Sequence, residues 1–257
     1  MGRVREQVGY AHSAGLEVVL MMYQDRLGPA FGGHGFPGWY LGDSADEQPG
    51  AEPDAAPLKS VWSRLWRSDA APLLGAWSRI IDTCDGADGV VGVVPITQPV
   101  AHVGEVAAVA RFNQSVLELF RTRFGPVLGF FEPILTESGV VWPDADLDDV
   151  AISTSIWGPA QGPRAHLEPP SEWLRVLAGL RAEHGNSVLV RASAQAAATD
   201  VRAVEALGFG PVLWLDGFGG DSGLRNDDGV PSRWFDELAD RILPWVVSGE
   251  VLGFGAE

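Results

Sequence analysis

Residues Val90 to Val100 read VVGVVPITQPV, a short apolar run that passes into a loop with two prolines. Valines around a single glycine, with no charged residue, are typical of a strand that is buried on both faces. Such strands belong to parallel sheets, whose long crossover connections place helices over the faces. The stretch therefore predicts a strand of a helix-covered parallel sheet, with Gln98 in the loop at its carboxyl end.

Similar apolar runs alternate with segments of helical periodicity along the whole chain. Val4, Val8 and Ala11 share one face of a helix that we expect to end at Gly15. Strands are expected at Glu17–Tyr23, Val90–Ile96, Val127–Phe131, Val150–Ile156, Val188–Val190 and Val212–Leu215. Helices are expected around residues 62–66, 73–81, 103–124, 172–184, 199–207 and 234–246. Six alternations of strand and helix predict parallel βα units in one α/β domain that spans residues 1–257.

Two architectures fit this alternation: an open doubly wound sheet and a (β/α)8 barrel, which takes about 250 residues. No glycine-rich phosphate turn follows any expected strand, so the nucleotide-binding open sheet lacks its motif. The segment FGGHG, Phe31 to Gly35, lies in the middle of a long loop and opens no helix. That loop, residues 28–57, is too long for an ordinary connection, and it is either functional or disordered.

Composition excludes several classes of function. The chain has 257 residues and a formal net charge of −16, which argues against binding to nucleic acid or to an anionic membrane. Cys84 is the only cysteine, so no intramolecular disulfide forms, and we expect a buried, small apolar side chain there. No apolar run is long enough to cross a bilayer and no signal peptide opens the chain. We expect a cytoplasmic protein, or a secreted one if its native start lies upstream.

Four segments, in order, resemble glycoside hydrolase family 5, a family of retaining (β/α)8 barrels, and most of all its endoglycoceramidase-like branch. The segments are VVLMMYQDRLGPAFGGHGFPGW (Val18–Trp39), VVGVVPITQP (Val90–Pro99), VLGFFEP (Val127–Pro133) and ILPWVVSGEV (Ile242–Val251). The first is the most specific, because its matches agree in spacing: Gln24, Asp25, Phe31, Gly32, Gly33, Gly35, Pro37 and Trp39. The resemblance implies a barrel that acts on or binds carbohydrate.

The catalytic motifs of that family are altered in this chain. Thr97-Gln98-Pro99 stands where the family has Asn-Glu-Pro, so Gln98 replaces the general acid/base. Ala192 falls where the family places its nucleophilic glutamate. Tyr23 replaces a histidine of the third strand, and Trp157 lies in the segment that replaces a Pro-His-x-Tyr motif. Retaining hydrolysis needs two carboxyl groups about 5 Å apart, so the resemblance implies loss of the family's mechanism.

The first two strands of the barrel have no counterpart in this alignment. Six strands cannot close an eight-stranded barrel without a partner or a distorted geometry. Three explanations stand: a gene start assigned too late, which we favour, a second chain that supplies the missing edge, or a six-stranded remnant. A homo-oligomer or another partner that completes the barrel is therefore among the expectations.

Several polar and aromatic residues are expected at the carboxyl ends of the strands, where a barrel gathers its active site. The candidate ligand contacts are Gln24, Asp25, His34, Trp39, Gln98, Trp157 and Trp214, of which Trp214 matches the family's sugar-stacking tryptophan. The candidate catalytic residues are Tyr23, Glu132 and Asp216. Structural hydrogen bonding is the competing interpretation for Asp25 and Glu132, and a loop cap is the competing one for Asp216. We expect no metal and no cofactor.

Three functions remain open on the sequence. The first is a disarmed glycosidase-like protein that binds a carbohydrate, a glycolipid or a similar small molecule. The second is an enzyme with other chemistry on a non-glycoside substrate, in which Glu132, Asp216 or Tyr23 acts as acid or base. The third is a residual glycosidase that recruits carboxylates from elsewhere.

Overall fold

The computed structural model describes residues 2–24, 27–28, 35–36, 56–142, 150–156, 179, 182, 188–192 and 214–215. The chain forms two compact units, Met1–Ala151 and Ile152–Glu257. Nearly all of the residues with described side chains lie in the first unit. The prediction that residues 1–257 make a single domain remains a prediction.

The first unit contains three parallel strands, β1 (Val18–Met21), β2 (Val90–Val94) and β3 (Leu128–Phe131). β2 lies between the other two, with Val93 opposite Leu20 on one side and Gly129 on the other. Gly92 is required in β2 because a Cβ atom there would lie 2.5 Å from the ring of Phe130. The glycine inside the valine run thus makes room for an aromatic side chain of the neighbouring strand.

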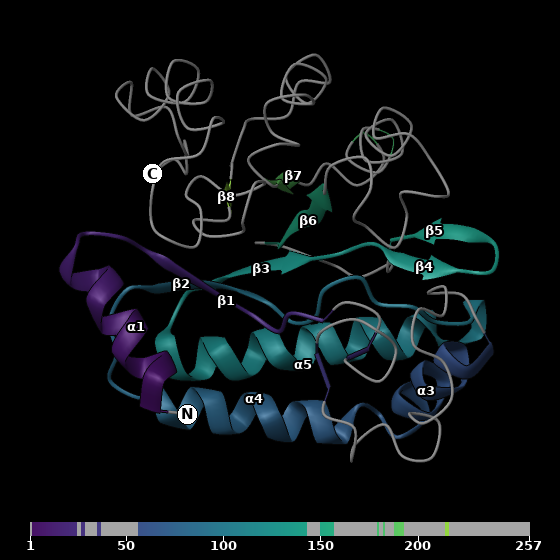
Figure 1. The fold of residues 1–257 in the computed structure, drawn as a ribbon, viewed down its shortest axis with the longest axis horizontal. Helices are drawn as coiled ribbons and strands as arrows, with labels where there is room; N and C mark the ends of the chain where they lie inside the picture. Colours follow the sequence, from purple (N-terminus) through teal and green to yellow (C-terminus); the bar gives the residue numbers. More distant parts are fainter. Residues whose placement is uncertain are drawn as a thin grey trace. The chain divides into compact units, whose positions relative to one another are not determined.

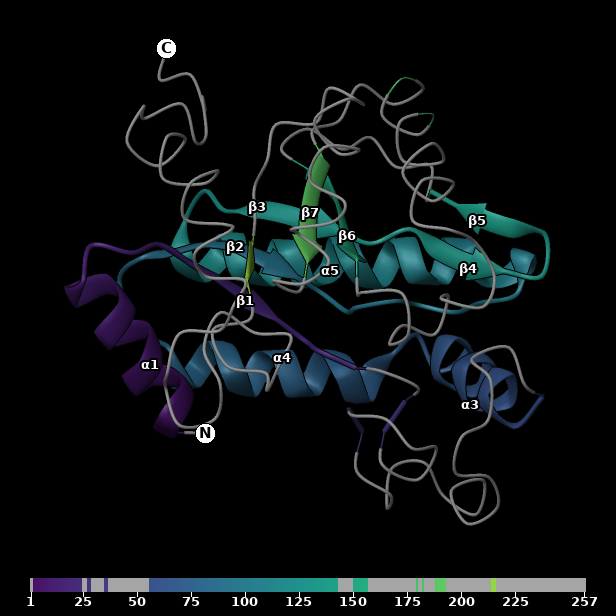
Figure 2. The ribbon, with the colours of Figure 1, turned by 45° about the horizontal axis from the view of Figure 1, so that its top comes forward.

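Helices cover one face of these strands (Figures 1 and 2). They are α1 (Gly2–Ser13), α3 (Ala56–Arg67), α4 (Ala71–Thr83) and α5 (Val106–Phe124), the last preceded by a short 3-10 turn, η3 (Val103–Glu105). Trp77 of α4 meets Phe120 of α5 edge to face, with ring centroids 5.1 Å apart. Trp62 and Trp66 of α3 stack at 5.5 Å. These three buried tryptophans therefore belong to the apolar core of the first unit.

A β-hairpin that was not predicted from the sequence follows β3. It pairs β4 (Ile134–Thr136) with β5 (Gly139–Val141), and the Thr136 hydroxyl donates to the Gly139 carbonyl at 2.8 Å across the turn. Gly139 has φ +110, which suits a glycine at the end of a tight turn. Each strand is only three residues long, too short for a convincing alternation of apolar and polar residues.

The second unit, which begins at Ile152 within the strand β6 (Val150–Ile156), is described mainly by its strands. β6, β7 (Val188–Ala192) and β8 (Trp214–Leu215) are parallel, with Ile156 opposite Ala192 and Ala192 opposite Leu215. The helices expected at 172–184, 199–207 and 234–246 lie outside the described residues, apart from the helical positions 179 and 182.

Most of the expected elements in the first unit are confirmed within a few residues. The expected helix end is also confirmed, since α1 stops at Ser13 and Gly15 has φ +74. One boundary was wrong: α3 begins at Ala56, so the last two residues of the expected loop 28–57 belong to a helix.

Cys84 is fully buried, as expected, and burial raises the pKa of its thiol despite the opposing charge of Arg5. In the part of the chain that the structure describes, no helix is long and apolar enough to span a membrane.

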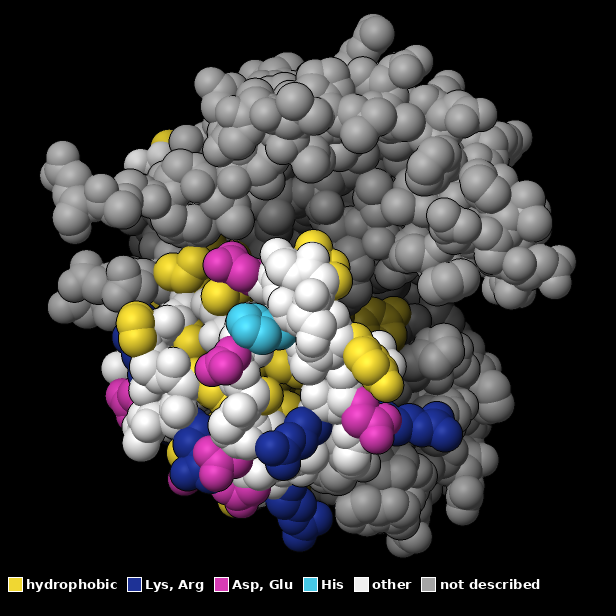
Figure 3. Space-filling model, turned by 90° about the vertical axis from the view of Figure 1, so that its left-hand side faces the viewer, with side chains coloured by type: hydrophobic (Ala, Val, Ile, Leu, Met, Phe, Trp, Pro, Cys, Tyr) yellow, Lys and Arg dark blue, Asp and Glu magenta, His cyan; other side chains and the backbone are white. Residues whose placement is uncertain are grey.

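The face of the molecule beside α1 carries acidic and basic side chains intermixed with separate apolar ones (Figure 3). Val8 is the only buried residue of α1.

None of the four residues of β1 is buried, although its sequence is uniformly apolar. β1 is therefore less covered than β2 or β3, most of whose residues are buried.

Candidate functional site

Polar residues from three neighbouring strands meet where β1, β2 and β3 end. Gln24 follows β1, Thr97 and Gln98 follow β2, and Glu132 follows β3 directly. The carboxyl ends of parallel strands lie at the same edge of a sheet, and this edge carries the active site in α/β barrels. We call these four residues the strand-end cluster.

Gln24 lies at the centre of the cluster and is only 2% exposed. Its side-chain amide donates to the carbonyl oxygens of Thr97 and Gln98, the latter at 3.1 Å. Its Oε1 accepts a hydrogen bond from the backbone N–H of Leu27 at 2.9 Å. These contacts engage both ends of the amide with the protein itself, which favours a positioning role over direct contact with a ligand.

Thr97 completes the junction between β1 and β2. Its hydroxyl accepts from the Gln24 N–H and donates to the Gln24 carbonyl, both at 2.8 Å. Thr97 is 1% exposed. Thr97 is not among the residues that we expected at the site from the sequence. Its position beside Gln98, at the same strand end, was the available signal.

Gln98 has an unusual backbone conformation and a side chain without a hydrogen-bond partner in the described ranges. Its φ is +48, in the left-handed region that residues other than glycine rarely adopt. Its N–H and its carbonyl are both engaged, with Glu132 and Gln24 respectively. Among the described residues, nothing hydrogen-bonds the side-chain amide of Gln98, which is partly exposed. That amide can therefore offer one acceptor and two donor hydrogens to a ligand.

Glu132 is buried, with 4% of its surface exposed. Its Oε2 accepts the N–H of Gln98 at 2.6 Å. This short hydrogen bond supports the Gln98 backbone from the strand that precedes Glu132.

Hydrogen-bond donors from two helices and from the hairpin bind backbone carbonyl oxygens of the loop around Gln98. Trp77 of α4 donates its indole N–H to Pro95 at 2.9 Å, and Trp66 of α3 donates to Val100 at 2.7 Å. Between them, the N–H of Leu135 in the hairpin donates to Pro99 at 2.9 Å. The tryptophans of the core thus also fix the loop that carries Gln98.

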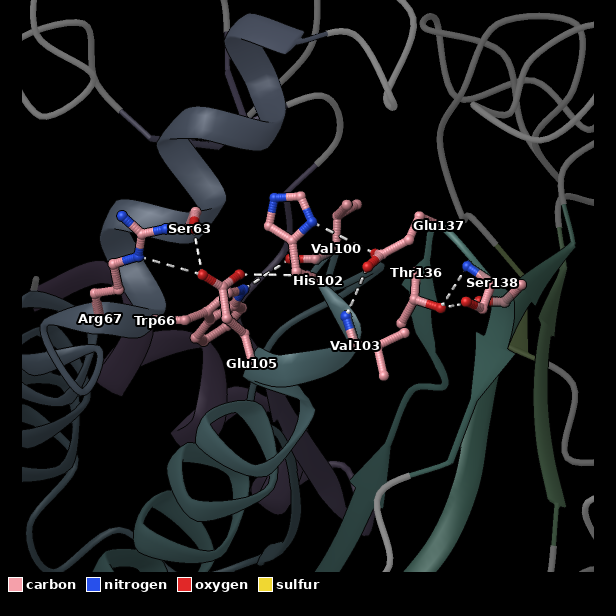
Figure 4. A network of polar contacts seen from close by, with 11 residues as sticks. Ser63, Trp66, Arg67, Val100, His102, Val103, Glu105, Thr136, Glu137 and Ser138 are labelled. Atoms are coloured by element: carbon pink, nitrogen blue, oxygen red, sulfur yellow. Dashed lines mark hydrogen bonds and ion pairs between the residues drawn. The ribbon is translucent and has the colours of Figure 1, made fainter.

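Two glutamates anchor the end of the same loop (Figure 4). Glu105 of η3 accepts from the Ser63 hydroxyl and from the N–H of His102, the latter at 3.2 Å, and pairs with Arg67 at 3.5 Å. Glu137 of the hairpin turn accepts from the N–H of Val103 at 3.2 Å and faces His102 at 3.5 Å.

The pKa of Glu137 is lowered by these surroundings. Hydrogen bonds from its own backbone N–H and from that of Val103 contribute most, and His102 adds to them. The glutamate is thereby held in its charged form at the turn between β4 and β5.

The other candidate residues lie in different parts of the chain. Tyr23 lies next to Gln24 with 40% of its surface exposed. Ala192 ends β7 and Trp214 opens β8, both described by their backbone. Asp25, His34, Trp39, Trp157 and Asp216 lie outside the described residues. The role of every candidate residue remains a prediction. Within the described ranges, no three His, Cys, Asp or Glu side chains gather as metal ligands would.

No family model matches the sequence, and no curated protein sequence matches it. Solved structures do match. Endoglycoceramidase II from Rhodococcus sp. matches with a TM-score of 0.67 at 16% identity over 92% of this chain. Two further structures of that enzyme, a lactosyl-enzyme intermediate and a ganglioside GM3 complex, match with a TM-score of 0.66. An endogalactoceramidase matches at 0.62, with 19% identity, over 83% of this chain and 56% of its own.

A β-glucanase from Saccharophagus degradans matches with a TM-score of 0.56 at 12% identity, over 95% of this chain and 72% of its own. The chain spans 64% of the length of the Rhodococcus endoglycoceramidase II. At these identities the likeness is one of fold. The chain has a partial α/β barrel fold like that of family 5 glycoside hydrolases, so the predicted fold class is confirmed.

Proposed function

We propose that the protein binds a carbohydrate or a glycolipid at the strand-end cluster and does not cleave it. The observation that carries this proposal is Gln98, whose backbone is fixed on both sides while its side-chain amide has no partner among the described residues. A side-chain amide on a fixed backbone suits a sugar hydroxyl, which both donates and accepts a hydrogen bond. An amide does not transfer protons near neutral pH, so it cannot replace a general acid.

The choice of ligands to test follows from the structural neighbours. One is a lactosyl-enzyme intermediate and another is a complex with ganglioside GM3, and both belong to an endoglycoceramidase. We therefore propose lactose-based headgroups as the first ligands for this chain, and β-glucan oligosaccharides as the second.

Titration calorimetry tests the binding. We expect the wild-type protein to bind a member of this panel and Gln98→Ala to weaken that binding about tenfold, the loss of a hydrogen-bonding side chain worth ~1.4 kcal/mol. Gln7→Ala is the matched control, because Gln7 is exposed on α1 and lies outside the cluster. A folded wild-type protein that binds nothing in the panel would contradict the proposal.

Dye release from aryl glycosides tests the absence of cleavage. The loss of general acid catalysis alone slows a glycosidase by about 10² to 10⁴. We expect no turnover above that of buffer for the wild-type protein. Turnover that Glu132→Gln abolishes would instead support an enzyme in which Glu132 acts as acid or base.

A further inference from the structure

Two residues other than glycine adopt left-handed backbone conformations next to Gln24. Leu27 has φ +62 and Gln98 has φ +48. Gln24 binds both of them, because its Oε1 accepts from the Leu27 N–H and its amide nitrogen donates to the Gln98 carbonyl. One buried side chain therefore holds two unfavourable backbone positions that are 71 residues apart in the sequence (98 minus 27).

Glu132 holds the same turn from the opposite strand. Its side chain accepts the Gln98 N–H at 2.6 Å, so the peptide groups on either side of Gln98 are both fixed by hydrogen bonds. A left-handed conformation in a residue other than glycine persists only where the surroundings impose it, and such positions concentrate at ligand sites. The hydrogen bonds of the Gln24 and Glu132 side chains thus account for the left-handed conformation of Gln98.

We propose that Gln24 and Glu132 are positioning residues that hold Gln98 in its left-handed conformation and so orient its side-chain amide toward a neutral, hydroxyl-bearing ligand. The ligand part of this inference rests on the proposed function, whereas the conformational part does not. A ligand then meets an amide whose backbone is already ordered, which reduces the entropy lost on binding.

A comparison of melting temperatures tests the conformational part without any ligand. Glycine adopts φ +48 without a steric penalty and alanine does not, so Gln98→Gly should melt about 2–4 °C above Gln98→Ala. In a Gln24→Met background, the turn is free to relax and the difference should disappear. Glu132→Gln keeps an oxygen acceptor of similar shape for the Gln98 N–H, so in that background the difference should shrink without disappearing. An undiminished difference in both backgrounds would overturn the proposal.

A double-mutant cycle tests the ligand part by calorimetry with the sugar that the wild-type protein binds. Gln24→Met and Glu132→Gln should each weaken binding about tenfold in the wild-type background. In the Gln98→Ala background, neither should weaken it further, because both act through Gln98. An equal loss in both backgrounds would show that Glu132 or Gln24 touches the ligand directly and would overturn the positioning role. If no sugar binds the wild-type protein, the proposed function fails, while the melting comparison still decides the conformational part.

Discussion

At Gly28, where the long loop begins, the backbone lies very close to the backbone of Phe36. Gly28 is buried, has φ +148, and a Cβ atom at this position would collide with the backbone carbonyl of Phe36. A backbone atom cannot turn away as a flexible side chain can. The Leu27–Gly28 corner is tied to the same place by the hydrogen bond from the Phe36 N–H to the Leu27 carbonyl at 2.7 Å.

We expect Gly28→Ala to lower the free energy of unfolding by about 2–3 kcal/mol, through backbone strain and overpacking. Gly75→Ala is the control, because Gly75 is exposed in α4 and a Cβ atom there meets nothing within 4 Å. That change should raise stability by about 1 kcal/mol through helix propensity. Urea unfolding measures both. Equal effects of the two substitutions would mean that the corner is not as tight as described.

Asn113 is a polar residue in the buried face of α5. It is 1% exposed, and its Oδ1 finds no hydrogen-bond donor in the described part of the protein. A buried carbonyl without a partner costs about 1–3 kcal/mol. We expect Asn113→Leu to raise the unfolding free energy by ~1 kcal/mol, and Asn113→Asp to lower it by more, since a buried charge is costlier. Thermal unfolding would contradict this if Leu destabilised as strongly as Asp.

The position of Gln98 could be predicted from the sequence, whereas the hydrogen bonds of Gln24 could not. An apolar run followed by Thr-Gln-Pro places Gln98 at a strand end, which is local information. The bonds of Gln24 join residues 73 and 74 positions away, and no pattern within either segment reports them. Its burial is likewise a property of the assembled strands.

The charge of Glu137, in the turn of the β4–β5 hairpin, should contribute to the stability of the protein. Because the folded pKa of Glu137 lies below its usual value of 4.5, the charged form stabilises the fold. This stabilisation is present above about pH 4.5 and is lost as the pH falls through the lowered pKa of Glu137 in the folded state.

We therefore expect Glu137→Gln to be less stable than the wild-type protein near neutral pH, with a difference that shrinks below pH 4.5. Urea unfolding at a series of pH values measures it. Glu118→Gln is the control, since Glu118 lies on α5 outside the Glu105–Glu137 network of Figure 4. A difference that stays constant down to pH 3 would show that the charge of Glu137 is not involved.

The long helix α5 was predicted well, whereas the short β4–β5 hairpin was not. The 19 residues of α5 repeat their apolar face several times, so their periodicity identifies a helix. The three-residue strands of the hairpin contain too few positions for any periodicity. Their pairing depends instead on the Glu137–Ser138 turn and on the bonds from Leu135 to the loop after β2.

At the scale of the whole chain, alternation of strands and helices indicated an α/β fold but left the open sheet and the barrel both possible. The order of four resembling segments, rather than any one of them, favoured the barrel. The structural neighbours confirm that choice. The same holds for the candidate site. Gln98, Gln24 and Glu132 meet at neighbouring strand ends, as we expect for parallel strands. That Gln98 and Ala192 lie close together remains a prediction.

The net charge of −16 should distinguish neutral from anionic sugars as ligands. A lactose headgroup is uncharged, whereas a sialylated lactose, such as that of a ganglioside, carries a carboxylate that a strongly acidic protein repels. Added salt screens this repulsion, because the Debye length falls from about 30 Å at 0.01 M to about 8 Å at 0.15 M. Over that range we expect the affinity for sialylated lactose to rise roughly threefold and the affinity for lactose to stay constant. Calorimetry with both sugars at each salt concentration measures the effect, and lactose serves as the internal control. If the affinity for the sialylated sugar falls with salt instead, a local positive charge must bind the carboxylate, and an anionic headgroup rather than a neutral one would be the preferred ligand.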